Sequence, residues 1–153
     1  MKKQKNRWIM LFCICCNTFC FGGVYAWSAF SGELANYMGW DYSKVTVAYS
    51  IMLMCVALMG LVGGMLLQRF GARKLMIAAG IMWGLGWFAT GMAGSIIMLY
   101  ASFGILAGCA SGFGYNPGVV TAVSWFPDKK GFASGMAVGT CGMASLIVAP
   151  LAN

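Results

Sequence analysis

The chain has 153 residues, of which 61% are hydrophobic and 8% are charged, and its formal net charge is +7. A soluble domain carries about 25% charged residues, so this composition excludes an ordinary water-facing surface and indicates that lipid is the main solvent. The basic excess does not indicate a nucleic-acid partner, because the cations gather in short segments between apolar runs.

Five apolar runs follow one another, each long enough to cross a bilayer, which takes about 20 residues. The sequence therefore predicts an all-α integral membrane protein in which residues 1–153 form one transmembrane bundle. The predicted spans are 8–30, 44–67, 75–93, 96–126 and 131–152.

The first run follows a basic lead, Met1 to Arg7, as a signal peptide would. We favour a membrane span, because the run is long and further spans follow it. The stretch from Ser31 to Lys44 has no excess of cations and is predicted to be the first outer loop. Asp41 or Ser43 is expected to cap the second helix by accepting a bond from a free backbone N–H.

A short basic stretch, Gly64 to Lys74, separates the second and third runs and predicts a tight turn. Short cytoplasmic loops gather Lys and Arg, so this turn is expected in the cytoplasm. Of the ten Lys and Arg, all but Lys44 then fall on the cytoplasmic side. The predicted location is the cell membrane, with several spans and a cytoplasmic N-terminus.

The fourth run carries Gly104, Gly108 and Gly112 at i+4 spacing, which predicts a smooth face for close packing of another helix. Pro117 lacks a backbone N–H and is expected to kink or unwind this run near 114–118. Beyond it, Asp128 in the second basic turn is expected to cap the fifth helix.

Catalytic and metal chemistry have little support. The chain has no His, and all three of its acids lie in the predicted turns, so the usual pairs of nucleophile and base are missing. Seven cysteines lie inside apolar runs, and Cys13, Cys16 and Cys20 share one helix face. We interpret them as packing residues and predict no enzyme activity, no metal site and no cofactor.

The basic stretch resembles the loop between the second and third helices of the major facilitator superfamily, written G-x-L-x-D-R-x-G-x-R-K. In this family the loop helps to latch the cytoplasmic gate. The matching positions are Gly64, Leu66, Arg69, Gly71, Arg73 and Lys74. Gln68, the remaining gate position, stands where the family has an acid, which implies a latch that is weaker or differently wired.

Two more stretches, Gly23 to Ser28 and Tyr115 to Gly135, resemble the oxalate/formate antiporter group, which is related to monocarboxylate transporters. The resemblance covers the first five of the family's twelve helices. It implies the N-terminal portion of a two-half transporter whose C-terminal half is missing here. The implied function is secondary transport of small organic anions by alternating access, with the lipid bilayer and a small carboxylate as partners.

The resemblance also assigns site residues. In this group the cations that hold a dicarboxylate lie in the C-terminal half, and the N-terminal half supplies aromatic and polar lining. Tyr25 and Tyr115 are the principal lining candidates, and Trp27 and Asn116 are the others. Each has a structural alternative, because Tyr and Trp also form interfacial belts and Asn116 can satisfy backbone groups freed by Pro117.

No carboxylate lies within a predicted span, so this half offers no proton relay. That favours exchange or facilitated movement over proton coupling through these helices. The alternative functions are a membrane subunit or scaffold that transports nothing, and a small half-transporter that dimerises.

Overall fold

The computed structural model describes residues 7–151, and the side chains of these residues except 26, 28–30 and 145–151. This part of the chain is helical between short turns and contains no strand, which confirms the all-α prediction. The elements are α1 (Arg7–Phe21), η1 (Gly22–Ala26), α2 (Trp27–Met38), α3 (Tyr42–Phe70), α4 (Ala72–Gly91), α5 (Ile96–Leu99), η2 (Tyr100–Ala107), α6 (Gly108–Trp125), η3 (Pro127–Lys129) and α7 (Lys130–Leu151).

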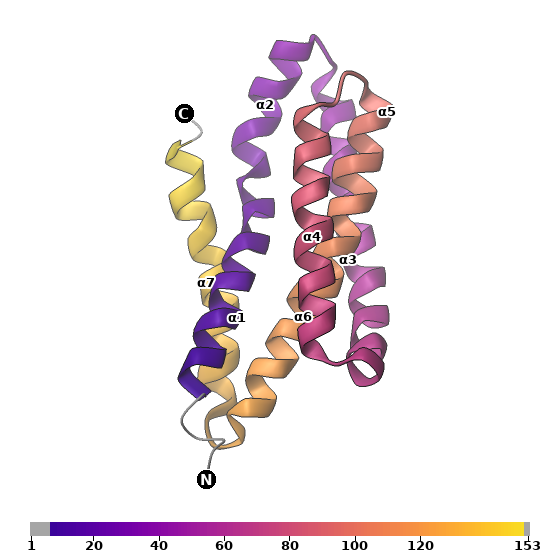
Figure 1. Cartoon of the computed structure of the whole chain (residues 1–153). Coiled ribbons are helices and arrows are strands. Elements are labelled where there is room, and N and C mark those ends of the chain that lie inside the picture. The colour runs from indigo at the N-terminus through magenta and orange to yellow at the C-terminus, as the bar shows by residue number, and fades with distance from the viewer. Residues whose placement is uncertain (1–6, 152–153) are drawn as a thin grey trace.

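Three helical stretches of the described chain are long and apolar enough to cross a membrane: Arg7–Tyr25, Tyr42–Phe70 and Ile96–Trp125. Helices α4 and α7 have 20 and 22 residues and run alongside them (Figure 1). The described chain therefore forms five rods, three of which have the length and composition of a membrane span. The five spans of the sequence analysis stay a prediction.

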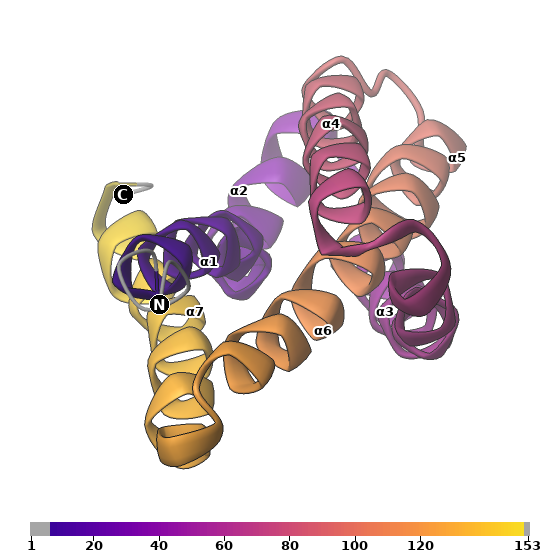
Figure 2. The same cartoon turned by 60° about the horizontal axis from the view of Figure 1, so that its bottom comes forward.

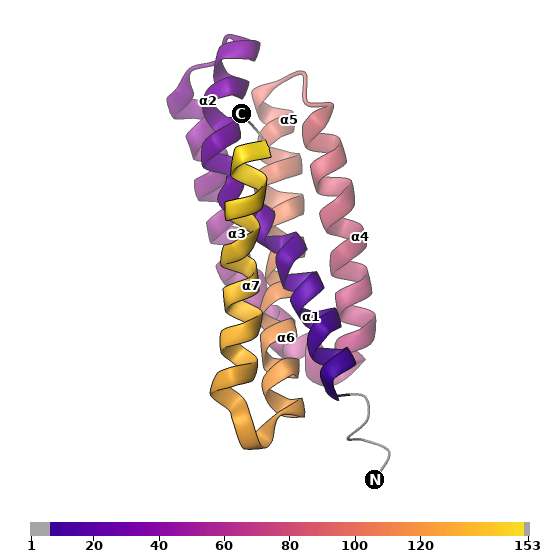
Figure 3. The ribbon, with the colours of Figure 1, turned by 90° about the vertical axis from the view of Figure 1, so that its left-hand side faces the viewer.

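The five rods form two groups joined by α6. Helices α3 and α4 and the α5–η2 segment stand together, while α1 and η1 lie beside α7 and α2 packs against α3 (Figures 2 and 3). Helix α6 begins in the first group, where its contact with α3 is the most extensive in the protein, and its far end leans toward α7. Most polar backbone groups are satisfied within helices, as a bilayer requires.

Both basic turns lie at the end of the bundle where α1 begins (Figure 1). We call this the basic end; its described cations are Arg7, Arg69, Arg73, Lys74, Lys129 and Lys130. The α2–α3 and α4–α5 turns lie at the opposite end, near Lys44. The fold thus places both basic turns at one end of the bundle and Lys44 at the other, as the order of the predicted spans requires.

The predicted first loop, from Ser31 to Lys44, is wrong in length, because α2 continues to Met38. The turn comprises only Gly39 to Asp41. Gly39 has a φ of +65°, which a glycine adopts without steric cost. Of the two cap candidates, Asp41 caps α3, and its Oδ1 accepts from the Ser43 N–H at 3.1 Å.

The central turn is tighter than the sequence suggested. Gly71 is the one residue between α3 and α4, and its N–H bonds the Leu67 carbonyl at 3.1 Å. Its φ and ψ of 78° and 155° lie in a region that is essentially restricted to glycine. The motif therefore occupies two helix ends, and its glycine is required by the backbone conformation.

Of the kink or unwinding predicted at Pro117, the unwinding is wrong, since α6 stays helical from Gly108 to Trp125, and the kink stays a prediction. A Cβ built on Gly63 of α3 would stand 3.3 Å from the Pro117 ring, so this glycine leaves room for the proline. The Pro117 carbonyl accepts from the Thr121 hydroxyl at 2.6 Å. Irregular backbone occurs instead at η1, a 3₁₀ segment, and at η2, a π-helix. Membrane helices tolerate proline where neighbours satisfy the freed groups.

The predicted glycine face lies against α3. A Cβ built on Gly104 would stand 2.9 Å from Ile51, and one on Gly108 would stand 2.8 Å from Cys55. At Gly112 it would stand 2.9 Å from a backbone oxygen of α3. These glycines allow two backbones to approach closely, which explains the extensive α3–α6 contact.

Candidate functional site

A cavity of about 90 Å³ lies where η1, α3, α6 and α7 meet. Its lining residues stand near the middle of the rods that carry them, so the cavity lies near mid-depth in the bundle. It has room for several water molecules or a small polar solute. The lining residues are Phe21, Val24, Tyr25, Leu53, Val56, Ser111, Tyr115 and Cys141.

The two principal candidates from the sequence, Tyr25 and Tyr115, both line this cavity. They come from separate rods, η1 and α6. The 3₁₀ segment follows Gly22, where a Cβ would collide with the Cys141 carbonyl and with Ala144. Glycine there lets η1 approach α7 and so brings Tyr25 to the wall that Cys141 also forms.

The chemistry of the cavity is that of uncharged donors in an apolar wall. Tyr25, Ser111 and Tyr115 carry hydroxyls, which donate to or accept from a polar solute. None of the described lining residues carries a formal charge. The cavity can therefore orient a carboxylate by hydrogen bonds, while neutralising it would need a cation from elsewhere.

Trp27 does not line this cavity. Its side chain is 5% exposed and its ring stacks on Phe103, with 3.8 Å between the centroids. The packing against Phe103 fixes the junction between the first rod and η2. Trp27 is thus buried in the bundle core and not exposed as a belt residue would be, and it lines a second cavity that adjoins the first.

Asn116 also lies outside the set that lines the cavity. Its residue is exposed, and its side-chain amide stands beside Gly60 on α3, where a Cβ would collide with it. Asn116 thus contacts the α3 backbone near Pro117. This position differs from the cavity-lining position expected from the sequence.

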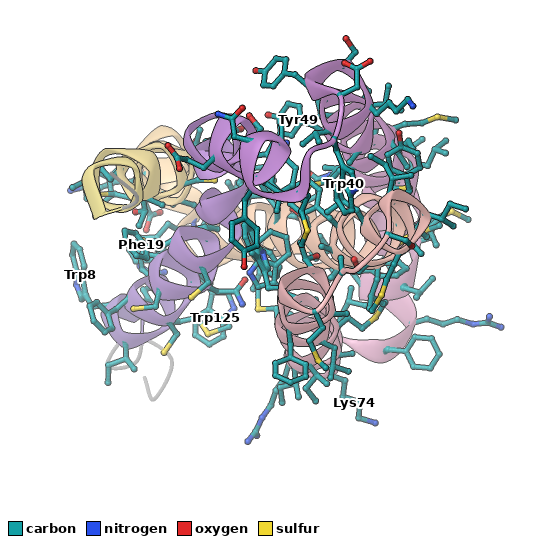
Figure 4. The ribbon with its side chains drawn as sticks, turned by 90° about the horizontal axis from the view of Figure 1, so that it is seen from above. Trp8, Phe19, Trp40, Tyr49, Lys74 and Trp125 are labelled. Carbon is teal, nitrogen blue, oxygen red and sulfur yellow. The ribbon has the colours of Figure 1, made fainter. Side chains whose placement is uncertain are left out.

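A second cavity, of about 190 Å³, adjoins the first and shares Val24 and Tyr25 with it. It is rich in hydroxyl groups and lies toward the end opposite the basic end. Tyr49, one of its residues, lies beside α2 (Figure 4). The full lining is Val24, Tyr25, Trp27, Ser31, Tyr42, Thr46 and Tyr49.

Sequence reasoning missed several of these residues. Ser111 was within reach, because it stands four residues before Tyr115 and so shares its helix face. Cys141 and Tyr49 gave no signal, because each belongs to a rod whose rotation about its own axis is set only by packing. The sequence identified one residue from each of two rods and left the others unassigned.

The gate motif lies at the basic end and is exposed. Gln68 and Arg69 end α3, while Arg73 and Lys74 begin α4, and Lys74 points away from the bundle (Figure 4). Cations at a helix N-terminus oppose the helix dipole, so helix stability does not account for this pair. Gly64, the first motif glycine, has nothing within 4 Å of a built Cβ.

Charge pairing in the described part of the chain is limited to one salt bridge, Arg7 to Asp128, at 3.5 Å. Asp128 therefore pairs with α1, and no bond from its carboxylate to the α7 backbone is present, contrary to the predicted cap. Within the same residues no three His, Cys, Asp or Glu gather as metal ligands would. Cys13, Cys16 and Cys20 are all exposed on α1.

An all-helical bundle that contains long apolar helices defines a multi-pass membrane protein. Residues 7–153 match the family model of the Major Facilitator Superfamily, so the chain belongs to that superfamily.

Three relatives refine the comparison. The chain is 36% identical over 94% of its length to the uncharacterized MFS-type transporter YhjX of Escherichia coli (strain K12), covering 36% of that protein. It is 32% identical over 95% of its length to the oxalate:formate antiporter of Oxalobacter formigenes, covering 35% of it. Monocarboxylate transporter 3 of Mus musculus is 28% identical over 94% of the chain, which covers 30% of it.

The chain spans about a third of the length of these curated relatives. They are transporters and not enzymes. The predicted resemblance to the superfamily, and to its oxalate/formate and monocarboxylate members, is thereby confirmed.

Proposed function

We propose that this chain is the N-terminal bundle of a secondary transporter for small organic anions, with oxalate, formate or another carboxylate as substrate. The observation that carries the proposal is the shared cavity of Tyr25, Ser111 and Tyr115. Uncharged donors in an apolar wall suit a small carboxylate whose charge is neutralised by the other half of the transporter. Similarity to an oxalate:formate antiporter supports the same substrate class.

Alternating access follows from the same proposal. The cavity lies at mid-depth, and two bundles rocking around it would open it to each side in turn. The exposed motif at Gly64 to Lys74 would form part of the inner gate. Because Gln68 carries no charge, it would hold that gate by hydrogen bonds and without an ion pair.

The orientation is also part of the proposal: the basic end faces the cytoplasm of the cell. Cysteine placed at Lys74 or Lys130 in a variant without native cysteines should react with an impermeant thiol reagent only after the membrane is opened. Cysteine at Lys44 should react in intact cells. Labelling of the Lys74 and Lys130 positions from opposite sides would overturn both the orientation and the span assignment.

The transport proposal is tested by exchange in proteoliposomes with the transporter that contains this bundle. Vesicles loaded with oxalate should take up labelled oxalate or formate in exchange. A scaffold or subunit that transports nothing would show no uptake above empty vesicles. Uptake by the 153-residue chain alone would instead favour the dimerising half-transporter.

Tyr115→Phe is the sharpest variant for this assay. Removing one hydroxyl that donates to a charged acceptor should raise the KM for oxalate by about tenfold, with membrane insertion unchanged. Tyr37→Phe, an 87% exposed tyrosine on α2 outside the mid-depth cavity, is the matched control and should leave KM unchanged. An unchanged KM in Tyr115→Phe would remove Tyr115 from the substrate site.

A further inference from the structure

A third cavity, of about 390 Å³, lies at the basic end, far along the bundle from the proposed substrate site. It is bounded by the first turn of α1, by η3 and by the first turn of α7. It combines cations and aromatic rings in one hollow. Its lining residues are Arg7, Trp8, Phe126, Asp128, Lys129 and Phe132.

The residues of this cavity carry more positive charge than they neutralise among themselves. Arg7 meets the Asp128 carboxylate through one nitrogen at 3.5 Å, and its guanidinium carbon lies 5.9 Å from the Phe126 ring centroid. The Asp128 side chain is 75% exposed, and such solvated pairs contribute little. Within the described residues Lys129 has no ion-pair partner. The lining set therefore has an excess of one positive charge.

Three aromatic rings form the other wall. Trp8 meets Phe126 and Phe132 edge to face, with centroids 5.7 and 6.3 Å apart. Phe126 is buried, whereas Trp8 is 65% and Phe132 46% exposed. Trp8 lies at the outside of the bundle beside α1 (Figure 4). An exposed tryptophan at the start of a span marks the level of the lipid headgroups.

The two walls together select the kind of ligand. Inorganic phosphate would use the cations and leave the rings without a partner. A phospholipid has a phosphate for Arg7 and Lys129 and acyl chains for the exposed faces of Trp8 and Phe132. Basic hollows at the ends of membrane helices bind anionic lipid headgroups in this way.

We propose that this cavity binds an anionic phospholipid. Its phosphate lies between Arg7 and Lys129, and the part of an acyl chain next to the headgroup lies on Trp8 and Phe132. The lipid joins the α1 start to the α6–α7 turn, two segments that the weak Arg7–Asp128 pair connects by charge. The site is independent of the substrate that the bundle transports.

The test uses the quenching of tryptophan fluorescence by phosphatidylglycerol brominated on its acyl chains, diluted into phosphatidylcholine vesicles that hold the protein. The part due to Trp8 is the difference between the protein and its Trp8→Phe variant. Brominated phosphatidylglycerol should quench Trp8 at a lower mole fraction than brominated phosphatidylcholine. Equal quenching by the two lipids would overturn the proposal.

A pair of matched double variants separates a site from a general effect of charge. Arg7→Gln with Lys129→Gln should raise the half-quenching mole fraction of phosphatidylglycerol by about tenfold or more, since each nearby cation contributes about fivefold. Arg73→Gln with Lys74→Gln removes two exposed cations at the same end and should change it by less than about twofold. Equal losses in both variants would reduce the effect to bulk electrostatics and overturn the site.

Two further measurements complete the test. Lys129→Gln alone removes a side chain without an ion-pair partner, so it tests the site even if loss of Arg7 impairs folding; an unchanged half-quenching point would contradict the proposal. Inorganic phosphate is added to vesicles in a separate titration. A lipid held by both its phosphate and its acyl chain should stay bound. Loss of the Trp8 quenching on adding phosphate, with no loss at the same ionic strength of sodium chloride, would show that the cavity recognises free phosphate and would overturn the lipid.

Discussion

Gly112→Val is expected to unfold the bundle or to lower its thermal midpoint sharply, because Gly112 is where α6 and α3 approach most closely through their backbones. A Cβ on Gly112 would stand 2.8 Å from the Met59 Cβ, 2.9 Å from the Val56 carbonyl oxygen and 3.0 Å from the Gly60 nitrogen. Two of these three atoms are backbone, so no rotamer change relieves the collision. Overpacking costs about 1–3 kcal/mol when side chains can adjust, and we expect about 3 kcal/mol or more here.

The matched control is Gly84→Val on α4, where a built Cβ has nothing within 4 Å. Both substitutions add the same atoms to a membrane helix, so they differ only in surroundings. The measurement is the thermal midpoint of the purified chain in detergent. Similar midpoints for the two variants would show that the glycine face does not set the α3–α6 distance.

Ser111→Leu is expected to abolish substrate exchange while leaving the protein folded and inserted. Ser111 is 5% exposed and its side chain faces the cavity that Tyr25 and Tyr115 also line. The larger side chain would occupy much of about 90 Å³. The space that would admit a small carboxylate is then filled by the protein itself. Burial of an added isobutyl group in an existing cavity should cost little stability.

Two controls accompany this variant in the exchange assay. Ser111→Ala removes the hydroxyl without filling the cavity and should weaken the apparent affinity by less than about tenfold, the value of one hydrogen bond. Ser124→Leu adds the same volume at an exposed position on the same helix and should leave exchange unchanged. Normal exchange by Ser111→Leu would show that substrate does not pass through this cavity.

The candidate site was partly accessible from the sequence. Tyr25 and Tyr115 were identified through motifs, and both line one cavity. Asn116, next to Tyr115 in the same motif, turns instead toward Gly60. Adjacent residues on a helix point about 100° apart, so a motif that marks a segment does not say which of its side chains faces the site. Cys141 could not be identified from the sequence, because no pattern in α7 shows how that helix is rotated about its own axis.

Pro117 and the predicted loop from Ser31 to Lys44 show that the course of the backbone was also only partly predictable from the sequence. Pro117 has the chemistry of a helix breaker, yet α6 continues through it, and its ring packs where Gly63 of α3 has no side chain. The charged residues between Ser31 and Lys44 suggested a long loop, yet α2 extends to Met38. Polarity alone does not end a helix; the turn comes where Gly39 reverses the chain.

The sequence by itself determined that this chain is an all-helical membrane bundle, because backbone groups in lipid must bond within helices. It also placed both basic turns at one end, since consecutive spans alternate in direction. Only the tertiary structure decided which side chains meet, because the rotation of each rod depends on the glycine contacts between α3 and α6 and between η1 and α7. The cavity of Tyr25, Ser111, Tyr115 and Cys141 is a product of those contacts.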